Sequence, residues 1–169
     1  MIKTAPKTAL VTGAAKRIGR AIALRLARDG YDIGVHYGRS RDDALALVVE
    51  LEALGVRAAA VPADLAEVAT GTRLIDDARA ALGPVCVLIN NASLYLPANL
   101  RETTSALIQK LNAIHVESPL LLCQQFEPML RAARGHVVNM VDLMAQRPWP
   151  QYLPYCASKA ALANLTLGL

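Results

Sequence analysis

Apolar residues along this chain fall into two alternating patterns, one typical of buried strands and the other typical of helices. Short runs that are apolar throughout predict strands at residues 8–12, 31–37, 56–61, 85–89 and 136–141. Apolar residues at helical spacing predict helices over residues 17–29, 41–54, 66–82 and 104–133, and a last helix that begins near Pro154. Because apolar strands that alternate with helices are typical of parallel sheets covered on both faces, the pattern predicts a doubly wound α/β fold.

The length and composition fit one globular domain that covers residues 1–169. Apolar residues make up 54% of the chain and charged residues 19%, and no repeat or Ser/Gly linker suggests a second domain. The net charge of +4 is carried by scattered basic residues, and the chain has a single Phe and a single Trp. Without an aromatic platform, nucleic acid is the weaker prediction and small phosphates are the better one.

The cysteines and the apolar runs bear on the compartment. Cys86, Cys123 and Cys156 form no C-x-x-C pair and mostly lie in apolar runs, so we expect buried thiols, a reducing compartment and no metal site. No run approaches the ~20 apolar residues that a membrane-spanning helix needs, and the N-terminal run is too short for a secretion signal. These features predict a cytoplasmic protein without membrane partners.

A glycine-containing loop joins the first predicted strand to its helix and reads Thr12-Gly-Ala-Ala-Lys-Arg-Ile-Gly19. Glycine lets the backbone approach a ligand closely, and the N-terminus of the following helix presents unpaired N–H groups that suit a phosphate. The loop lacks the strict G-x-G-x-x-G spacing, and two glycines after a strand are often only a turn. The strand and helix units that follow it favour a nucleotide site.

Tyr155 and Lys159 would lie one turn apart on the last predicted helix, so that a phenol and an ammonium share one face. A nearby cation stabilises the phenolate and is expected to lower the tyrosine pKa from about 10, which suits a general acid or base. Asp142 would end the preceding strand at the same edge of the sheet. The Tyr-x-x-x-Lys spacing is weak evidence on its own, since both residues also occur on ordinary solvated helices.

Together with Asn90-Asn91-Ala92, these motifs resemble the short-chain dehydrogenase/reductase family, whose pattern is Thr-Gly-x-x-x-Gly-x-Gly, Asn-Asn-Ala-Gly, and Ser followed by Tyr-x-x-x-Lys. The resemblance spans the whole chain and implies a Rossmann-type fold. Three positions depart from the pattern, because Arg17 replaces the middle glycine, Ser93 the last glycine and Asp142 the serine. With His36-Tyr-Gly-Arg-Ser40, these departures look like the pteridine reductase branch.

The resemblance implies a set of cofactor-binding residues that mostly follow the first four strands. They are Gly13, Arg17, Ile18, Gly19, His36, Tyr37, Arg39, Ser40, Asp64, Leu65, Asn90, Asn91, Ala92, Ser93, Tyr155 and Lys159. Asp64 would contact the adenine amino group and Leu65 would pack on the adenine ring, although Asp64 could equally cap the next helix. Residues 90–93 would lie beside the nicotinamide ribose, and otherwise they form only a polar loop.

The end of the second predicted strand decides which nicotinamide cofactor fits. An acidic residue there holds the ribose 2′-hydroxyl of NAD, whereas arginine accommodates a 2′-phosphate. No carboxylate precedes Asp42, and Arg17, Arg39 and Arg41 supply guanidinium groups that match phosphate geometry. NADPH is therefore the predicted cofactor. The alternative is that Ser40 merely caps a helix and forms a capping box with Asp43. The arginines would then only be solvated.

The catalytic residues that the resemblance implies are Tyr155, Lys159, Asp142 and Asn112, the last at the place where the family links the lysine to a water chain. An ionised Asp142 would repel the alkoxide formed from a ketone, so we expect a pterin whose C=N bond takes hydride from NADPH. Tyr155 would supply the proton, and a partly protonated Asp142 in an apolar site would orient or relay it. Otherwise Asp142 only caps the loop after the fifth strand.

The predicted substrate-binding residues are Ser93, Tyr95, Asp142 and Tyr155. Tyr95 lies near the position where the family stacks an aromatic ring on the pterin, while Trp149 and Tyr152 would wall the pocket or pack elsewhere. Two alternatives stay open, because fold and cofactor do not determine substrate. One is a related reductase for another carbonyl or imine, and the other is a non-catalytic NADP(H)-binding protein.

The family continues beyond the lysine helix with two more strands and a mobile substrate-covering segment, which the 169 residues do not include. We therefore expect these residues to be part of a longer protein, to be inactive alone, and to leave the fifth strand along an exposed edge. The family commonly forms tetramers. The small apolar residues Ala157, Ala160, Ala161 and Ala163 are compatible with a homotetramer or with packing on the chain's own sheet.

Overall fold

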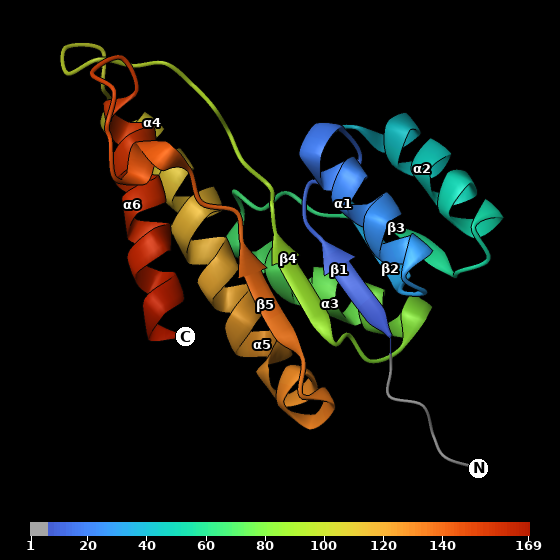
Figure 1. Cartoon of the computed structure of the whole chain (residues 1–169). Helices are drawn as coiled ribbons and strands as arrows, with labels where there is room; N and C mark the ends of the chain where they lie inside the picture. Colours follow the sequence, from blue (N-terminus) through green and yellow to red (C-terminus); the bar gives the residue numbers. More distant parts are fainter. Residues whose placement is uncertain (1–6) are drawn as a thin grey trace.

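The strands form one parallel sheet in the order β3-β2-β1-β4-β5. The computed structural model describes residues 7–169, apart from the side chains of residues 68–72. The strands are β1 (Thr8–Val11), β2 (Asp32–Tyr37), β3 (Ala58–Pro62), β4 (Val87–Asn90) and β5 (His136–Asn139). Figure 1 shows them side by side with helices on both faces. The prediction of a doubly wound α/β fold is thereby confirmed.

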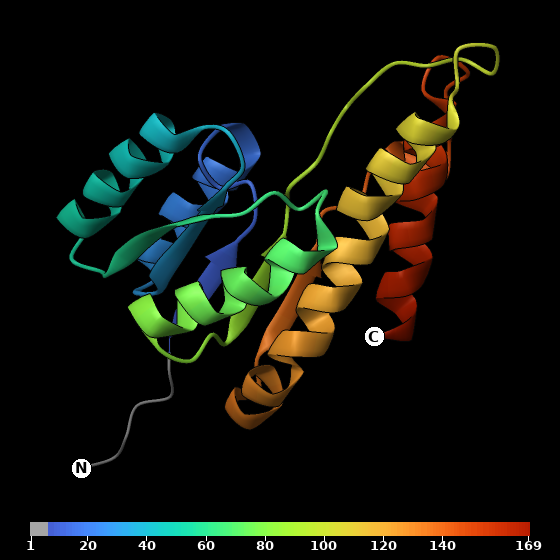
Figure 2. The same cartoon turned by 180° about the vertical axis from the view of Figure 1, so that it is seen from behind.

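Helices cover both faces of the sheet. Helices α1 (Arg17–Arg28) and α2 (Arg41–Ala53) lie on one face, and α3 (Val68–Leu82) and α5 (Ser118–Ala133) lie on the other (Figures 1 and 2). Helices α4 (Ser105–Asn112) and α6 (Leu153–Gly168) pack against each other on the β5 side. Since successive strand residues point to opposite faces, Ala9 and Val11 join the core under α1 while Leu10 joins the core under α3.

Local sequence explains where several helices begin and end. Thr104 begins α4 by accepting the backbone N–H of Leu107 on its side-chain oxygen at 3.2 Å. Pro154 lies in the first turn of α6, where its missing N–H costs nothing. Gly30 follows α1 with φ +83°, a conformation that favours glycine, and turns the chain into β2. These signals place the carboxyl ends of the strands next to the helix N-termini.

The long helix expected over residues 104–133 is interrupted. Between α4 and α5 the chain forms a π-helical turn over Ala113–Glu117. Pro119 gives a physical reason, because its ring lacks an N–H and would clash with the carbonyl of His115 in a continuous α-helix. The wider turn lets the chain continue from α4 into α5 without a break. It also directs the segment around His115 into the protein, where this segment is buried.

Among the described strands, β5 pairs with β4 alone. Cys86, Cys123 and Cys156 are buried and free, as the sequence predicted. Over the part of the chain that the structure describes, no helix combines the length and the apolar character that crossing a membrane requires.

Candidate active site

Two glycines let the loop after β1 pack against the loop after β4. Gly13 has φ +62°, and a Cβ built on it would lie 3.0 Å from the Ala92 Cα. A Cβ on Gly19 would overlap the Gly13 carbonyl oxygen and lie 2.6 Å from Asn91 Nδ2. Among the described residues, no side chain caps the N-terminus of α1, and its first turn holds no acidic residue. The N–H groups of this turn therefore suit the phosphates of a nucleotide.

The buried ring of His36 supports this glycine loop. The Gly13 N–H donates to Nδ1 at 3.0 Å, so Nδ1 is an acceptor and the ring hydrogen is on Nε2. Nε2 then donates to the Ala63 carbonyl at 3.1 Å. Burial lowers the pKa of His36 to about 4, which keeps the ring neutral at pH 7. Both ring nitrogens are used within the protein, so His36 shapes the loop and offers no free nitrogen to a cofactor.

Thr12 and Asn91 tie the two loops together. Thr12 Oγ1 accepts the backbone N–H groups of Asn91 and Ala92, both at 2.9 Å. Asn91 Nδ2 donates to the carbonyls of Thr12 at 2.8 Å and Gly13 at 3.1 Å. Asn90 Nδ2 donates to Asn139 Oδ1 at 2.8 Å, and its own Oδ1 is buried without a partner among the described residues. These bonds bring residues 90–93 to the carboxyl ends of the strands, where ligands bind in open α/β sheets.

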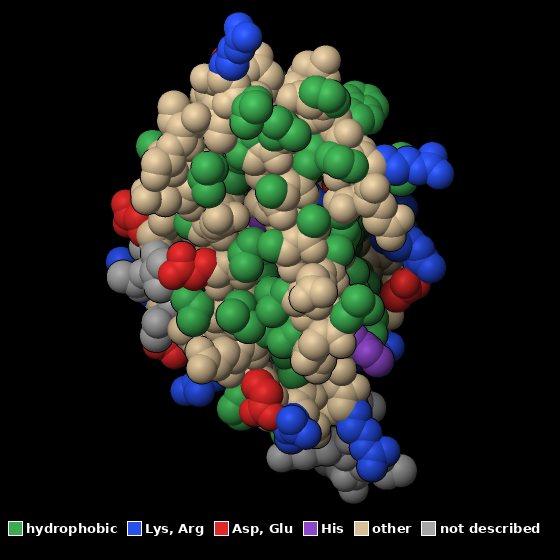
Figure 3. All heavy atoms as spheres, turned by 90° about the vertical axis from the view of Figure 1, so that its left-hand side faces the viewer, with side chains coloured by type: hydrophobic (Ala, Val, Ile, Leu, Met, Phe, Trp, Pro, Cys, Tyr) green, Lys and Arg blue, Asp and Glu red, His purple; other side chains and the backbone are tan. Residues whose placement is uncertain are grey.

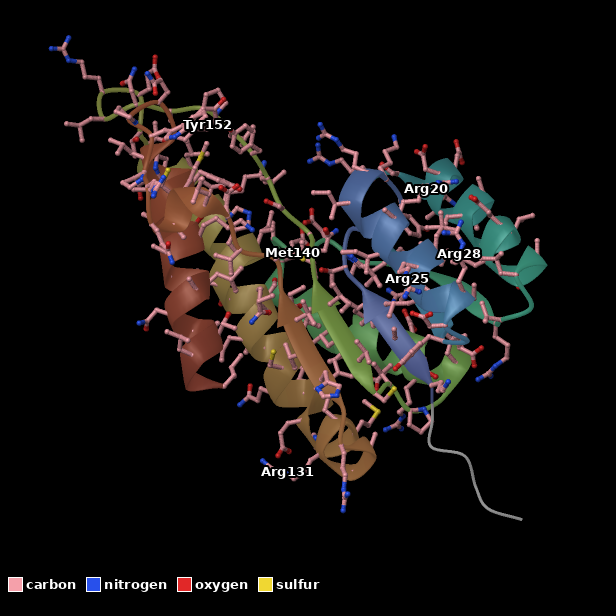
Figure 4. The ribbon with its side chains drawn as sticks, in the orientation of Figure 1. Arg20, Arg25, Arg28, Arg131, Met140 and Tyr152 are labelled. Carbon is pink, nitrogen blue, oxygen red and sulfur yellow. The ribbon has the colours of Figure 1, made fainter. Side chains whose placement is uncertain are left out.

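Arg17 has an unusual backbone conformation. Its φ is +53°, in the left-handed region that glycine adopts more easily, and its side chain is exposed. Lys16, Arg17 and Arg20 line an open hollow of about 360 Å³ between α1 and α2. Within it Lys16 pairs with Asp43 at 2.8 Å, and Arg20, labelled in Figure 4, pairs with Glu50. The exposed guanidinium of Arg17 thus lies at the start of α1, and its contact with a phosphate stays a prediction.

The end of β2 carries further exposed cations. Arg39 and Arg41 are exposed, and no carboxylate comes between them and the strand. Ser40 precedes α2 but makes no side-chain cap bond, and Asp43 is paired with Lys16, so the predicted capping box does not form. The capping box does not form because the Lys16 ammonium is a stronger partner for the Asp43 carboxylate than a backbone N–H is. Two other cofactor contacts were predicted here. Tyr37 is half-buried against the core under α1, whereas Ile18 is exposed.

Asp64 and Leu65 follow β3. Asp64 Oδ1 accepts the backbone N–H of Ala66 at 2.9 Å and so shapes the turn before α3. Leu65 is buried in the core with Val61 and Leu122, and its carbonyl accepts the Ser118 hydroxyl at 2.5 Å. Leu65 therefore packs inside the protein, and its predicted contact with adenine stays a prediction.

Tyr155, Lys159 and Asp142 converge where β5 ends and α6 begins. The Tyr155 hydroxyl donates to Asp142 Oδ2 at 2.7 Å, and Asp142 Oδ1 accepts the backbone N–H of Met144 at 2.8 Å. Lys159 Nζ donates to the carbonyl of Met140, labelled in Figure 4, at 2.7 Å and lies 6.0 Å from the centre of the Tyr155 ring. The spacing along α6 thus places phenol and ammonium on one buried face, as predicted.

The pKa of Tyr155 contradicts the sequence expectation. Burial, followed by the hydrogen bond to Asp142, raises this pKa above its ordinary value of 10. The predicted lowering by Lys159 is wrong because the carboxylate contacts the phenol directly, whereas the ammonium is directed at a backbone carbonyl. Tyr155 therefore keeps its proton at neutral pH.

Asp142 is ionised, which corrects the expectation of a partly protonated carboxyl. The backbone N–H of Met144 contributes most to lowering the pKa of Asp142, and Tyr155 and Lys159 add to this effect against burial. Burial lowers the pKa of Lys159 to about 8, with Asp142 opposing the shift, so the ammonium stays charged at neutral pH. Asp142 also begins the turn over Leu143–Ala145, so it caps this loop and contacts Tyr155 at once.

His115 is a site residue that the sequence reasoning missed. It lies in the π-helical turn, is 1% exposed, and contacts both the loop after β4 and helix α6. Its Nε2 lies 2.9 Å from Ser93 Oγ and 3.2 Å from the Leu94 nitrogen, and its Nδ1 lies 2.8 Å from Ser158 Oγ. The available signal was a titratable residue between the apolar residues Ile114 and Val116, four residues before Pro119.

Asn112, the predicted fourth catalytic residue, lies at the last position of α4. Its side chain is exposed and makes no hydrogen bond to any described residue. The structure therefore does not join Asn112 to the Tyr155 cluster, and its catalytic role stays a prediction. The polar side chain buried three residues later is that of His115.

Aromatic rings gather beside the phenol. Tyr95 stacks on Tyr152, with ring centres 4.4 Å apart, and meets Tyr155 edge-on at 4.9 Å. Trp149 lies edge-on to Tyr152 at 6.5 Å. Ala98 forms a parallel bridge with Tyr152, which Figure 4 labels near the start of α6, and so joins the Tyr95 loop to the segment before that helix. Tyr95 is half exposed, so one part of its ring surface is open to a ligand.

Comparison with known proteins agrees with this fold and site. The sequence profile of the short chain dehydrogenases matches residues 7–169, and the chain belongs to this family of oxidoreductases. A curated relative, 3-oxoacyl-[acyl-carrier-protein] reductase FabG of Staphylococcus epidermidis, is 34% identical over 161 residues, which cover 95% of this chain and 66% of the relative. The chain thus spans about two thirds of the length of the curated relatives that it matches.

Two solved structures show the same similarity with a bound nucleotide. FolM alternative dihydrofolate reductase 1 from Brucella suis, in complex with NADP, has a TM-score of 0.88 and 34% identity and covers 94% of this chain and 66% of its own. A blue fluorescent protein from a metagenomic library, in complex with NADPH, has a TM-score of 0.88 and 39% identity and covers 96% of this chain and 66% of its own.

Proposed function

We propose that this protein binds NADPH and acts as a reductase. Helix α1 begins without a capping side chain or an acidic residue, Arg17 is exposed at its start, and Arg39 and Arg41 follow β2 with no carboxylate between them and the strand. The nucleotides bound to the two similar structures support the same cofactor. A dissociation constant that is no tighter for NADPH than for NADH would contradict this part of the proposal.

The proposed substrate is a pterin of the dihydropterin or dihydrofolate type. The observation that carries this choice is the ionised Asp142, which accepts the Tyr155 hydrogen bond where the family pattern has a serine. A carboxylate repels the oxyanion that forms from a ketone, but it accepts the N–H groups of an amino-pyrimidine edge. The stacked Tyr95 ring and the similarity to FolM support the same substrate class.

The mechanism follows from the positions of three side chains. A bound NADPH would supply the hydride that reduces the carbon of the substrate C=N bond. Tyr155 holds the proton that the adjacent nitrogen needs, because its raised pKa keeps the phenol protonated at neutral pH. Asp142 fixes the direction of the phenol by accepting its hydrogen bond. The Lys159 ammonium lies 6.0 Å from the ring centre, so its charge partly offsets the Asp142 carboxylate when the phenolate forms, without outweighing the effects that raise the Tyr155 pKa.

A serine substitution tests the substrate class directly. The assay follows NADPH oxidation by the native full-length protein. The candidate substrates are dihydrobiopterin, dihydrofolate, an acetoacetyl thioester and a simple ketone. We expect turnover with the pterins, and we expect Asp142→Ser to lower it while raising turnover of the ketone substrates. Turnover of the thioester alone would favour the second candidate, a 3-oxoacyl reductase, to which the 34% identity with FabG points. NADPH binding without turnover of any substrate would favour a non-catalytic binding protein.

The assembly and the compartment are also proposals. We infer a homotetramer, since Ala157 and Ala161 are exposed on α6, and Figure 3 shows apolar side chains spread over the face that includes this helix. A molar mass of a single chain in solution would contradict this. The three free, buried thiols fit the reducing cytoplasm.

A further inference from the structure

The hydrogen bonds of His115 fix its tautomer. The backbone N–H of Leu94 is 3.2 Å from Nε2 and can only donate, so Nε2 carries a lone pair and no hydrogen. The single ring hydrogen is then on Nδ1, which donates to Ser158 Oγ at 2.8 Å, while the Ser158 hydroxyl donates to the Tyr155 carbonyl at 2.7 Å. The ring is neutral, since burial and then the nearby Lys159 charge lower the pKa of His115 to about 3.

This tautomer also fixes the Ser93 hydroxyl. Ser93 Oγ lies 2.9 Å from Nε2, and because Nε2 has no hydrogen, the hydrogen between these two atoms belongs to Ser93. The Ser93 hydroxyl has only one hydrogen, so its remaining lone pairs face away from the buried ring. Ser93 itself is exposed, and the hydrogen that it directs at His115 is not available to a ligand. The open side of Ser93 is thus an acceptor.

Ser93 and Asp142 therefore flank Tyr155 with acceptors. Asp142 is an ionised carboxylate in contact with the phenol, and the Ser93 oxygen presents lone pairs. The phenol hydrogen is donated to Asp142 and the Ser93 hydrogen to His115, so none of the three groups directs a hydrogen at a ligand. A ligand edge that carries N–H donors matches this arrangement, whereas a bare carbonyl that covers the two acceptors leaves both without partners, which costs binding free energy.

We propose that His115 is a positioning residue that makes Ser93 an acceptor and thereby selects ligands with N–H donors over ligands with only a carbonyl. This rests on the proposed function, whose substrate it narrows to molecules with an amino-pyrimidine edge. His115 achieves this by joining the Ser93 loop to α6 through Ser158, next to Lys159. The π-helical turn brings its ring to this position.

Nitrogen NMR of the three histidines tests the tautomer without any assay of activity. His115 is expected to show the neutral pattern with hydrogen on Nδ1, and His36 the opposite neutral pattern with hydrogen on Nε2. The exposed His136 provides a comparison outside both hydrogen-bond networks. A His115 signal with hydrogen on Nε2, or a charged ring at pH 7, would overturn the proposal, because Ser93 would then be free to donate.

Ligand binding to the NADP-loaded native protein tests the selection. The probes are a 2,4-diaminopyrimidine, which carries N–H donors, and an acetoacetyl thioester, which does not. His115→Phe keeps the ring volume but cannot accept from Ser93, and we expect it to reduce the preference for the diaminopyrimidine about 10-fold. His115→Gln, whose amide oxygen accepts and whose amide nitrogen donates, should retain the preference within about threefold.

The controls separate this inference from the proposed function. His136→Phe, at the exposed edge of the sheet, should leave both affinities unchanged, and NADPH affinity measured in every variant shows whether the cofactor site is intact. Equal loss of both probes in His115→Phe would show a purely structural role and sink the proposal. Should His115→Phe fail to fold, the ligand preference of His115→Gln and the NMR pattern of the wild-type histidines still test the proposal. Failure of pterin turnover with an intact preference would refute the proposed substrate alone.

Discussion

Two buried histidines play similar parts in different halves of the molecule. His36 accepts the Gly13 N–H on Nδ1 and donates from Nε2, whereas His115 accepts the Leu94 N–H on Nε2 and donates from Nδ1. Each neutral ring joins a loop at the carboxyl end of the sheet to a neighbouring element. The opposite tautomers show that the hydrogen-bond partners, and not the residue type, decide what each ring presents.

The two halves differ in what the histidine controls. In the half that contains β1 to β3, His36 holds a backbone turn, and the surfaces offered to a nucleotide are main-chain N–H groups and exposed arginines. In the half that contains α4 to α6, His115 orients a side-chain hydroxyl beside Tyr155. Backbone geometry therefore positions the groups that face a nucleotide, and side-chain hydrogen bonds position the groups of the catalytic half.

Removing the Tyr155 hydroxyl should affect only the catalytic half and produce the largest effect. Tyr155→Phe is expected to lower turnover about 10³-fold, because proton transfer by a positioned acid contributes this order of rate. NADPH affinity should change by less than threefold, since the phenol donates to Asp142 and not to the glycine loop. NADPH oxidation and fluorescence titration measure the two effects, with Tyr31→Phe as a control in the other half. Retained turnover would remove Tyr155 from the mechanism.

A methyl group at Gly19 should damage the nucleotide half. The added Cβ would overlap the Gly13 carbonyl and press on Asn91, so Gly19→Ala is expected to cost about 3 kcal/mol of unfolding free energy and to abolish NADPH binding. Gly168→Ala is the matched control, because nothing lies within 4 Å of its added Cβ. Urea unfolding would compare the two. Equal stability of both variants would show that the loops are not tightly packed.

Exchanging His36 for Phe tests whether the two histidines differ in function as proposed. The Gly13 N–H and the Ala63 carbonyl would lose their partners, so His36→Phe should cost about 2 kcal/mol of stability. NADPH affinity should fall in this variant, whereas His115→Phe should spare it. Calorimetric titration of both variants with NADPH makes the comparison. A similar loss of NADPH affinity in the two would mean that both rings serve the same half.

The contrast between the halves also explains what could be predicted from sequence. Apolar spacing located all five strands and the helices between them, apart from the π-helical turn over Ala113–Glu117, because burial on a sheet or helix repeats along the chain. The glycine loop was recognisable for a similar reason, since Gly13 and Gly19 allow conformations and contacts that other residues do not. These signals are local, and each can be read from consecutive residues.

The catalytic half depends on contacts between residues that are distant in sequence. His115 and Ser158 are 43 residues apart, and nothing in the spacing of either predicts that they meet. The i, i+4 spacing placed Tyr155 and Lys159 on one face but could not show that the ammonium is directed at Met140 while Asp142 contacts the phenol. The sign of the Tyr155 pKa shift depends on these directions, which is why the sequence expectation was wrong.

The pH dependence of turnover sharpens the electrostatic account of the catalytic half. Turnover should fall as pH rises through about 8, where Lys159 loses its charge, while Tyr155 titrates at much higher pH. Asp142 opposes the lowering of the Lys159 pKa, so Asp142→Asn should move this alkaline limb to lower pH by up to about one unit. Because the folded pKa of about 8 lies below the ordinary 10.5, the contribution of Lys159 to stability rises between these values. An unmoved limb in Asp142→Asn would contradict the coupling.

Arg17 offers the smallest and most specific test of the nucleotide half. Its left-handed backbone conformation lowers stability, whereas its side chain is expected to strengthen NADPH binding. Arg17→Gly and Arg17→Ala both remove the guanidinium, and each should weaken NADPH binding about 10-fold without weakening NADH binding. Only the glycine variant relieves the left-handed conformation at φ +53°, so it should be more stable than the alanine variant by about 1 kcal/mol. Thermal unfolding and titration with both nucleotides separate the two effects. Equal weakening of NADPH and NADH would place Arg17 against the pyrophosphate shared by both cofactors, and the 2′-phosphate would then depend on Arg39 and Arg41.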